Sequence, residues 1–332
     1  MSAEAAPSQN GFATVAVLGD LHKAYEQVNL AVAWRAAQVS GFPLRLAAWV
    51  TALFTNPRWL VFDGSALDQP MYPHCGPPAG SRFADTWLRM VLTKPMDTFI
   101  ARQPSIDTSV YVDDFGLMAH GRVTRIVEHM PTAVANLVDV IRQAGLAFAN
   151  DKWQIVASSP KIAEAIAVKA RKLHIPLKVV GAARNLGADF TAGKAASVTV
   201  RNSRVDAVKS RTGRLHALKA AGIDASKFFH TASSPLGLYS TDVSGIGNHQ
   251  LHGMRNAAAA AAPGGIRHRN VGLVLALVAR PRYDLIYRAT EAPVYAWACA
   301  VWEKYKPTQL KFATDAAKAH TGWAQVRGPA GP

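Results

Sequence analysis

Two adjacent carboxylates, Asp113 and Asp114, interrupt a run of strand-forming residues, TSVYVDDFGLMA, at positions 108–119. β-Branched and aromatic residues on both sides of an acidic turn predict two short strands joined as a hairpin. A third carboxylate, Asp20, follows the buried strand predicted at 13–18 (ATVAVL). Taken singly, an Asp at a strand end is more typical of a helix cap or a turn, and an Asp-Asp pair is more typical of a simple turn.

Carboxylates that separate strands bring together repel each other as bare anions, because each disfavours the charged form of its neighbour. Mg²⁺ removes that repulsion, since it prefers oxygen ligands from a few carboxylates, phosphates and water. Two such ions about 3.5–4 Å apart can activate an attacking hydroxyl and stabilise a leaving pyrophosphate. If the three carboxylates meet, we expect a site for two Mg²⁺ ions, with Mn²⁺ as the alternative ion.

Hydrophobic periodicity predicts one α+β unit over the first 192 residues. An amphipathic helix should begin at Ala24 and end before Gly41, and Pro131 should break or restart a helix predicted at 122–144. A hairpin is expected at 146–157 around Asn150-Asp151. The other expected helices cover 44–54, the residues from Phe83 onward and 160–173, and the other expected strands cover 58–63 and 184–190.

Positive charge concentrates in the second part of the chain. Residues 193–332 hold 19 basic and 7 acidic side chains, which is +12 of the total net charge of +15. Helical, Ala- and Arg-rich segments predominate from about residue 201, and the six-alanine run at 257–262 predicts a featureless helix. A near-neutral part joined to a strongly basic one indicates a polyanionic binding partner, and nucleic acid fits better than a membrane surface. The alternative is a soluble protein that is basic without binding a polyanion.

The sequence carries no sign of secretion or of a membrane span. Its two cysteines, Cys75 and Cys299, lie far apart and encode neither a disulfide framework nor a zinc module. The N-terminus lacks the basic and apolar regions of a signal peptide, and the apolar run at 271–279 is too short to cross a bilayer. We therefore expect an intracellular protein, in the nucleus or the cytoplasm, with no membrane partner.

Five motifs, in their order along the chain, resemble those of the palm of a reverse transcriptase. The resemblance is strongest to the polymerases of LINE-type (non-LTR) retrotransposons. DLHKAYEQV (20–28) resembles the motif DLxKA(F/Y)xxV, and YVDD (111–114) is similar to the YxDD box. GPPAGS (76–81) stands at the place of a GxPQG-type loop. The stretch 145–152 resembles GLxxNxxK, and NLGA (185–188) resembles the LG(V/A) segment that leads out of the palm.

The resemblance implies an α+β polymerase palm, an antiparallel sheet with helices on one face, at residues 13–192. A disordered N-terminus would occupy 1–12, a basic and mainly helical thumb or connection region 193–320, and a flexible tail 321–332. The fingers should precede the first motif and are expected to be missing. The chain would then be the middle and rear of a longer polyprotein, with its fingers or endonuclease regions as partners, and would not be active alone.

The implied function is an RNA-directed DNA polymerase, a nucleotidyltransferase that adds dNTPs to a primer 3′-OH. Its partners would be an RNA template, a DNA primer and dNTPs. The alternative is a catalytically inactive, truncated relic that only binds nucleic acid. An RNA-directed RNA polymerase ranks lower, because such enzymes typically have a carboxylate where this chain has Tyr25 and GDD where it has YVDD.

The resemblance also assigns roles to individual residues. The catalytic metal ligands would be Asp20, Asp113 and Asp114, with Leu21 as a further metal ligand. The residues expected to contact the incoming nucleotide are Tyr25, a gate against the ribose 2′-hydroxyl, with Gly80, Ser81 and Lys152. Those expected to contact nucleic acid are Tyr111, beneath the primer terminus, and Arg201, Arg204, Arg211 and Arg214, part of the basic segment from Lys194 to Lys219.

Simpler interpretations of these residues remain open. Tyr25 also begins the apolar stripe of its helix, and Tyr111 could simply fill the sheet. Lys152 and the arginines could be ordinary solvated side chains. Three residues depart from the motifs: Ala79 replaces a glutamine and loses a polar contact, Gly19 replaces a larger apolar residue and should loosen the strand before Asp20, and His22 replaces a small or polar residue.

Overall fold

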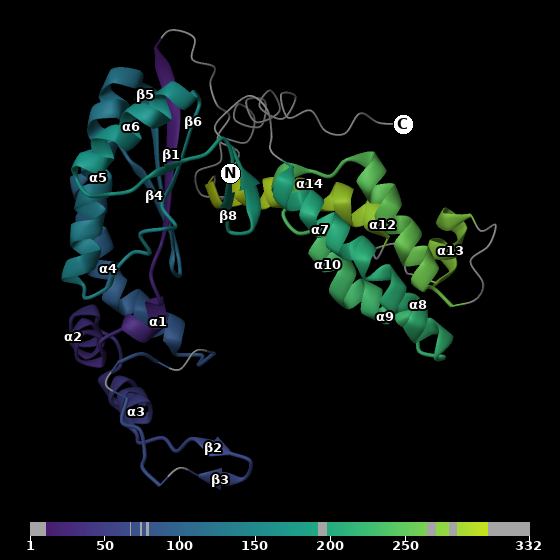
Figure 1. Ribbon diagram of the computed structural model, residues 1–332, viewed down its shortest axis with the longest axis horizontal. Coiled ribbons are helices and arrows are strands. Elements are labelled where there is room, and N and C mark those ends of the chain that lie inside the picture. Colours follow the sequence, from purple (N-terminus) through teal and green to yellow (C-terminus); the bar gives the residue numbers. More distant parts are fainter. Residues whose placement is uncertain are drawn as a thin grey trace. The chain divides into compact units, whose positions relative to one another are not determined.

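The structure, a computed structural model, describes residues 11–66, 68–73, 75–77, 80–191, 198–263, 270–278 and 284–304. These residues form two compact units (Figure 1). The N-terminal unit holds the described residues up to Asn185, together with Thr191. The C-terminal unit holds Leu186–Phe190 and the described residues from 198 onward. Of the disordered N-terminus expected at 1–12, residues 1–10 lie outside the described residues, and Phe12 instead begins the first strand. The tail expected at 321–332, Ala79 and Lys194 also lie outside the described residues.

The N-terminal unit is built on a five-stranded sheet with the order β4-β5-β1-β6-β7. Neighbouring strands run antiparallel except β6 and β7, which are parallel. The strands are β1 (Phe12–Asp20), β4 (Asp107–Tyr111), β5 (Asp114–Arg122), β6 (Gln154–Ala157) and β7 (Lys178–Val179). The expected α+β class, the strand at 13–18 and the hairpin around the Asp-Asp pair are confirmed.

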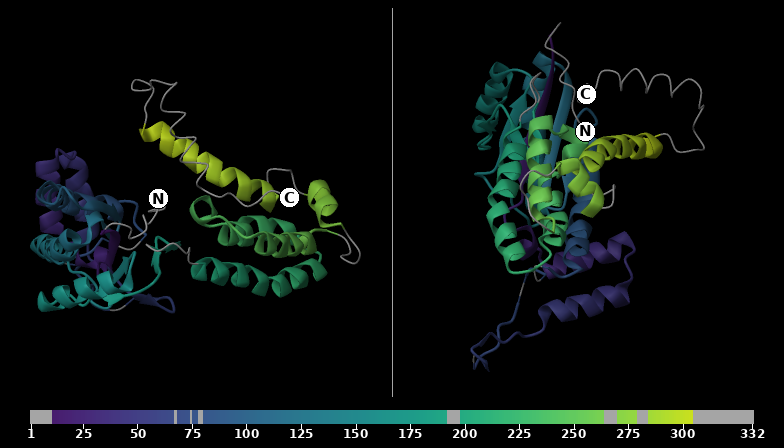
Figure 2. Two further views of the ribbon diagram at one scale, coloured as in Figure 1. Left: turned by 90° about the horizontal axis from the view of Figure 1, so that it is seen from above. Right: turned by 90° about the vertical axis from the view of Figure 1, so that its right-hand side faces the viewer.

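Helices α4, α5 and α6 lie together on one side of this sheet (Figures 1 and 2). The alternation along β5 explains why, because Phe115 and Leu117 are buried on that side while Gly116 and Met118 are only half-buried. Each large apolar side chain buried there contributes roughly 1.5–3 kcal/mol. The helices of this unit are α1 (Ala24–Gln27), α2 (Leu30–Ser40), α3 (Leu44–Thr55), α4 (Ala84–Arg102), α5 (Val123–Gln143) and α6 (Pro160–Lys172).

The helix expected from Ala24 to Gly41 is divided at Val28 and Asn29. Val28 is extended, and the Asn29 side chain accepts hydrogen bonds from the backbone N–H groups of Ala31 and Val32. Asparagine is a preferred N-cap, so a new helix begins at Leu30. The single-helix prediction was wrong because the apolar periodicity runs unchanged through the cap.

The break expected at Pro131 is also absent, since α5 continues through it. Pro131 is buried, and so are Met130 before it and Val134 after it. A proline inside a helix costs about 3 kcal/mol or more, which the buried face of a six-turn helix can offset. The lesson is that burial of a whole helix face outweighs one lost backbone hydrogen bond.

Three predicted strand segments also differ from the structure. The stretch 146–157 is no hairpin, because Phe148 bridges to Leu21 and β6 pairs with β1 instead. The strand expected at 58–63 is reduced to β2 (Val61–Phe62), which pairs with β3 (Ser65–Ala66). The strand expected at 184–190 is a small hairpin of β8 (Ala183–Asn185) and β9 (Ala188–Phe190), with Leu186 and Gly187 at positive φ in its turn.

The C-terminal unit is mainly helical, as expected (Figure 2). Its core contains Val208, Phe229 and Met254 together with the alanines of α12, which are all buried. The six-alanine run is therefore not featureless, because its small side chains lie in the centre of the unit. The helices are α7 (Thr199–Ser210), α8 (Thr212–Ala220), α9 (Ala225–Phe228), the π-helical turn η1 (Phe229–Ser233), α10 (Ser234–Gly237), α11 (Thr241–Ser244), α12 (Asn248–Ala261), α13 (Val271–Val278) and α14 (Leu285–Lys304).

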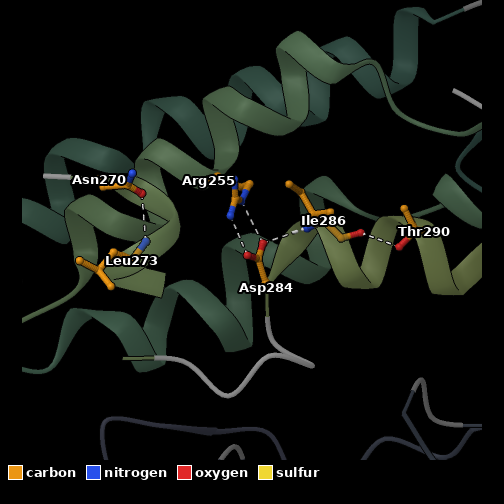
Figure 3. Close-up of polar contacts among 6 residues, drawn as sticks. All are labelled: Arg255, Asn270, Leu273, Asp284, Ile286 and Thr290. Atoms are coloured by element: carbon orange, nitrogen blue, oxygen red, sulfur yellow. Dashed lines mark hydrogen bonds and ion pairs between the residues drawn. The ribbon is translucent and has the colours of Figure 1, made fainter. Parts of the chain in front are cut away.

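One ion pair ties α12 to the start of α14. Arg255 donates two hydrogen bonds to the carboxylate of Asp284, at 3.0 and 2.8 Å, and Asp284 accepts a third from the backbone N–H of Ile286 (Figure 3). Burial alone would raise the pKa of Asp284, but these hydrogen bonds lower it overall. The pair therefore caps α14 and fixes it to α12. Among the described helices, none combines the length and the apolar character needed to cross a bilayer.

Candidate active site

The sheet brings the three predicted carboxylates to one edge. Asp20 ends β1 and is the direct partner of Asp114, which begins β5. Asp113 lies in the adjoining turn, and its carbonyl oxygen accepts a hydrogen bond of 3.0 Å from the N–H of Leu21. Residues more than 90 positions apart therefore meet because β1 and β5 pair along their whole length.

A tight turn holds the Asp-Asp pair in place. Tyr111 pairs with Asp114, so that Val112 and Asp113 form a two-residue hairpin loop. Val112 has φ of 59°, a left-handed conformation that is unusual for a β-branched residue. Such strain costs on the order of 1–3 kcal/mol and persists only where the surroundings fix it. Here Val112 packs against the core, and the pairing of β4 with β5 closes the loop.

The carboxylates form a strained electrostatic group. Burial raises the pKa of Asp114, and the charges of Asp113 and Asp20 raise it further. The Lys152 ammonium forms an ion pair with Asp20 Oδ2, which raises the pKa of Lys152. The other carboxylate oxygen, Asp20 Oδ1, is buried and has no hydrogen-bond partner within the described residues. Within the described residues, the three carboxylates therefore have a single ion-pair partner, the Lys152 ammonium.

Aromatic rings support the carboxylates from within the unit. Phe148 lies between Phe115 and Trp153, with ring centroids 5.1 and 4.6 Å away. Trp153 occupies the space beside Gly19, since a Cβ at Gly19 would lie 2.5 Å from its ring. Gly19 does not loosen β1, contrary to expectation, because the strand continues to Asp20 and the ring of Trp153 fills the vacated volume. His22, the other described departure, has an exposed side chain and donates its backbone N–H to Ala147.

Tyr25 lies close to this group. Its side chain is half-buried, and its hydroxyl donates a hydrogen bond to Asp85 in the first turn of α4. Burial, this hydrogen bond and the charges of Asp85 and Asp113 raise the pKa of Tyr25 to about 12. Tyr25 therefore does more than fill a core, because its polar end is held at the surface near the carboxylates.

The glycine-rich loop is attached to the same short helix. The Gly76 N–H donates to the Val28 carbonyl at 2.9 Å, and a Cβ at Gly76 would lie 2.9 Å from the Cα of Glu26. Gly80 has φ of +84°, which favours glycine, and Ser81 accepts hydrogen bonds that begin α4. The structure thus places Gly80 and Ser81 on a loop whose two ends adjoin Tyr25 and Asp85.

The predicted nucleic-acid contacts divide into free and engaged side chains. Tyr111 is 63% exposed, so it does not fill the sheet. Arg201 donates to the carbonyls of Ser244 and Gly245, and Arg204 stacks 4.1 Å from the ring centroid of Tyr239. Arg211 donates to Ala232, whereas Arg214 is exposed. Arg201 and Arg204 lie on α7, whereas Arg211 lies at the junction between the end of α7 at Ser210 and the start of α8.

Sequence reasoning missed Asp85, Trp153 and Arg184. An acidic residue in the first helical turn is usually attributed to the helix dipole, so nothing singled out Asp85. Gly19 lies on β1 and Trp153 lies just before β6, and only the pairing of these two strands brings the small and the large residue together. Arg184 on β8 lies near enough to lower the pKa of Asp114, and its position just before the NLGA motif was the only signal.

The sequence matches the family model described as reverse transcriptase (RNA-dependent DNA polymerase) over residues 4–184. This match covers more than half of the chain, so the chain belongs to the reverse transcriptase family. The matched region ends where the N-terminal unit ends. No curated protein shows significant sequence similarity to the chain.

Proposed function

We propose that this chain is the polymerase part of a LINE-type retrotransposon protein, with a palm at 13–192 and a basic thumb at 193–320. It would add dNTPs to the 3′-OH of a primer paired with an RNA template. The observation that carries the proposal is the direct pairing of Asp20 with Asp114, with Asp113 in the adjoining turn. Membership of the reverse transcriptase family supports it, and the LINE-type assignment rests on the motifs DLHKAYEQV and NLGA.

The donor set fits divalent metal ions. Within the described residues, no three or more His, Cys, Asp or Glu side chains are arranged so that they could together hold a metal ion. Mg²⁺, however, commonly takes one or two carboxylates and completes its shell with phosphates and water. The unpartnered Oδ1 of Asp20 and the unfavourable charge on Asp114 are what such an ion would relieve. Asp20, Asp113 and Asp114 would hold two ions, with the Leu21 carbonyl as a further ligand.

When bound, Mg²⁺ would activate the primer hydroxyl and stabilise the pyrophosphate. The chain's own residues would do the remaining work. Lys152 pairs with Asp20 in the free protein, and its long, half-exposed side chain would turn to the triphosphate and donate a proton to the leaving pyrophosphate. Tyr25 would exclude the ribose 2′-hydroxyl, while Gly80 and Ser81 would line the nucleotide. The exposed ring of Tyr111 would contact the primer terminus.

The second candidate is an inactive relic that only binds nucleic acid. The presence of all three carboxylates favours the polymerase over this relic. Primer extension separates the two when the full chain is given an RNA template, a DNA primer and dNTPs. Contrary to the expectation from the sequence, we propose that the chain is active by itself, because the three carboxylates, Tyr25 and Gly80 all belong to the N-terminal unit. The polymerase proposal therefore predicts binding of the duplex and Mg²⁺-dependent extension that EDTA stops. Duplex binding with no extension, in either Mg²⁺ or Mn²⁺, would support the relic and contradict the polymerase.

A further inference from the structure

Two helices that are distant in the sequence meet through one side-chain hydrogen bond at the edge of the candidate site. Tyr25 on α1 donates its hydroxyl proton to Asp85 Oδ1 on α4, across 60 positions of sequence. Asp85 is exposed and lies in the first turn of α4, where the helix dipole favours a negative charge. Since the pKa of Tyr25 is raised to about 12, its hydroxyl keeps its proton at neutral pH.

We propose that Asp85 is a positioning residue that fixes the ring of Tyr25 and thereby sets the preference for deoxyribonucleotides over ribonucleotides. The inference rests on the proposed function, in which Tyr25 is the gate. Asp85 touches neither the sugar nor the phosphates in this account. It acts only through the orientation of the ring.

The surroundings of Tyr25 explain why a tether is needed. A half-buried ring without a partner at its polar end can move between χ1 rotamers, whereas a hydrogen bond to the hydroxyl fixes where that end lies. Helix α1 is only four residues long and cannot hold the ring by itself. Gly76 packs on the backbone of Glu26 from one direction, and the hydrogen bond to Asp85 fixes the hydroxyl from α4.

The tether also links the two segments that would contact the nucleotide. Helix α4 begins immediately after the loop that carries Gly80 and Ser81, with the Ala84 N–H donating to the Ser81 carbonyl. A ring held by α4 therefore keeps a fixed position relative to that loop. Discrimination between two similar sugars depends on small differences in position, because it is a difference between two binding free energies.

The test measures kcat/KM for a dNTP and for the matching rNTP with the full chain on a primed RNA template. Asp85→Ala should lower the ratio roughly threefold to tenfold, the net worth of one hydrogen bond. In a Tyr25→Phe background, which has no hydroxyl to tether, Asp85→Ala should change nothing further. Asp85→Asn should keep most of the discrimination, because its amide oxygen still accepts. Asp97→Ala, which removes another exposed carboxylate from α4, is the matched control.

A second measurement separates positioning from mere stability. Equilibrium binding of the two nucleotides to the chain on primer–template should show the same loss of preference, while urea unfolding reports any loss of stability separately. An unchanged ratio in Asp85→Ala, or an equal drop in the Tyr25→Phe background, would overturn the inference alone. A parent chain that extends no primer would contradict the proposed function and overturn the inference with it.

Discussion

Asp20 on β1 and Asp114 on β5 are direct partners in an antiparallel register, so one sheet edge carries two carboxylates from distant parts of the chain. The turn that follows Tyr111 adds Asp113 beside them. Only one ammonium group, that of Lys152, forms an ion pair with any of the three within the described residues. The free protein therefore stores repulsion that a bound cation would relieve.

Because of that repulsion, the charge on Asp114 should lower the stability of the metal-free protein. Asp114→Asn should raise the Tm in EDTA by about 1–3 °C, because it removes a charge that burial and two neighbouring carboxylates disfavour. The same change should abolish primer extension. Differential scanning fluorimetry measures the shift, and Asp107→Asn, an exposed carboxylate at the far end of β4, is the control. A lower Tm for Asp114→Asn would show that the cluster is not repulsive.

Lys152 should compete with metal for Asp20. Lys152→Met removes the ammonium that occupies Oδ2, so we expect Mg²⁺ to bind at least about threefold more tightly. Extension should nevertheless slow by roughly 100-fold or more, because the proposed proton donor to the leaving pyrophosphate is lost. The stability gained on titrating Mg²⁺ gives the affinity, and Lys161→Met on α6 is the matched control. Unchanged Mg²⁺ affinity would mean that Lys152 and the metal do not share a site.

Tyr25 should give the protein an alkaline pH dependence. Its pKa is raised from 10.0 to about 12 on folding, so its contribution to stability is present below pH 10 and is lost as the pH rises through 12. Between these values the parent should lose stability faster than Tyr25→Phe, measured by urea unfolding. Tyr111→Phe, which alters an exposed tyrosine, should follow the parent. Parallel curves for the parent and Tyr25→Phe would argue against the hydrogen bond to Asp85.

Gly19 should be intolerant of any side chain. Gly19→Ala places a Cβ 2.5 Å from the Trp153 ring and should destabilise the fold by about 1–3 kcal/mol. Trp153→Leu also costs stability, but the double variant should be more stable than the sum of the two losses predicts. Gly181→Ala, which meets open space, is the control. Strict additivity would show that the ring and the glycine are not coupled.

Arg214 and Arg204 should differ in their effect on nucleic acid. Arg214 is exposed, so Arg214→Ala should reduce the slope of log K against log salt by about 0.9 if it touches one phosphate of an RNA–DNA duplex. Arg204 stacks on Tyr239, so Arg204→Ala should chiefly lower the Tm. Fluorescence anisotropy at several salt concentrations gives the slopes. Equal slopes for the parent and Arg214→Ala would exclude Arg214 from the duplex contact.

The sequence predicted the elements that carry the carboxylates because their signals are local. Alternating apolar residues and an acidic turn are enough to place β1 and the hairpin of β4 and β5. Proximity of Asp20 to the Asp-Asp pair needed the motif order, since no local signal reveals which strands pair. Two helix predictions failed for reasons that the apolar pattern does not reveal. Asn29 caps a new helix inside an apolar stripe, and Pro131 lies within a helix that tertiary packing sustains.

The side-chain partners of the site were harder to predict. Trp153 beside Gly19 and Asp85 beside Tyr25 are contacts between segments that only the folded chain brings together. The arginines show the reverse problem. The basic segment from Lys194 to Lys219 predicts a phosphate-binding face. In the structure, however, Arg201 and Arg211 donate hydrogen bonds to backbone carbonyls of their own unit. Charge patterns reveal the amount of positive charge but not its partners.

Primer extension by carboxylate variants tests the central claim most directly. The full chain, with an RNA template, a DNA primer, dNTPs and Mg²⁺, should extend the primer, and Asp113→Asn and Asp20→Asn should each lower the rate by at least about 1,000-fold while duplex binding persists. Asp107→Asn should extend like the parent. Extension that survives in Asp113→Asn at the parent's rate would contradict the assignment of this sheet edge as the polymerase site.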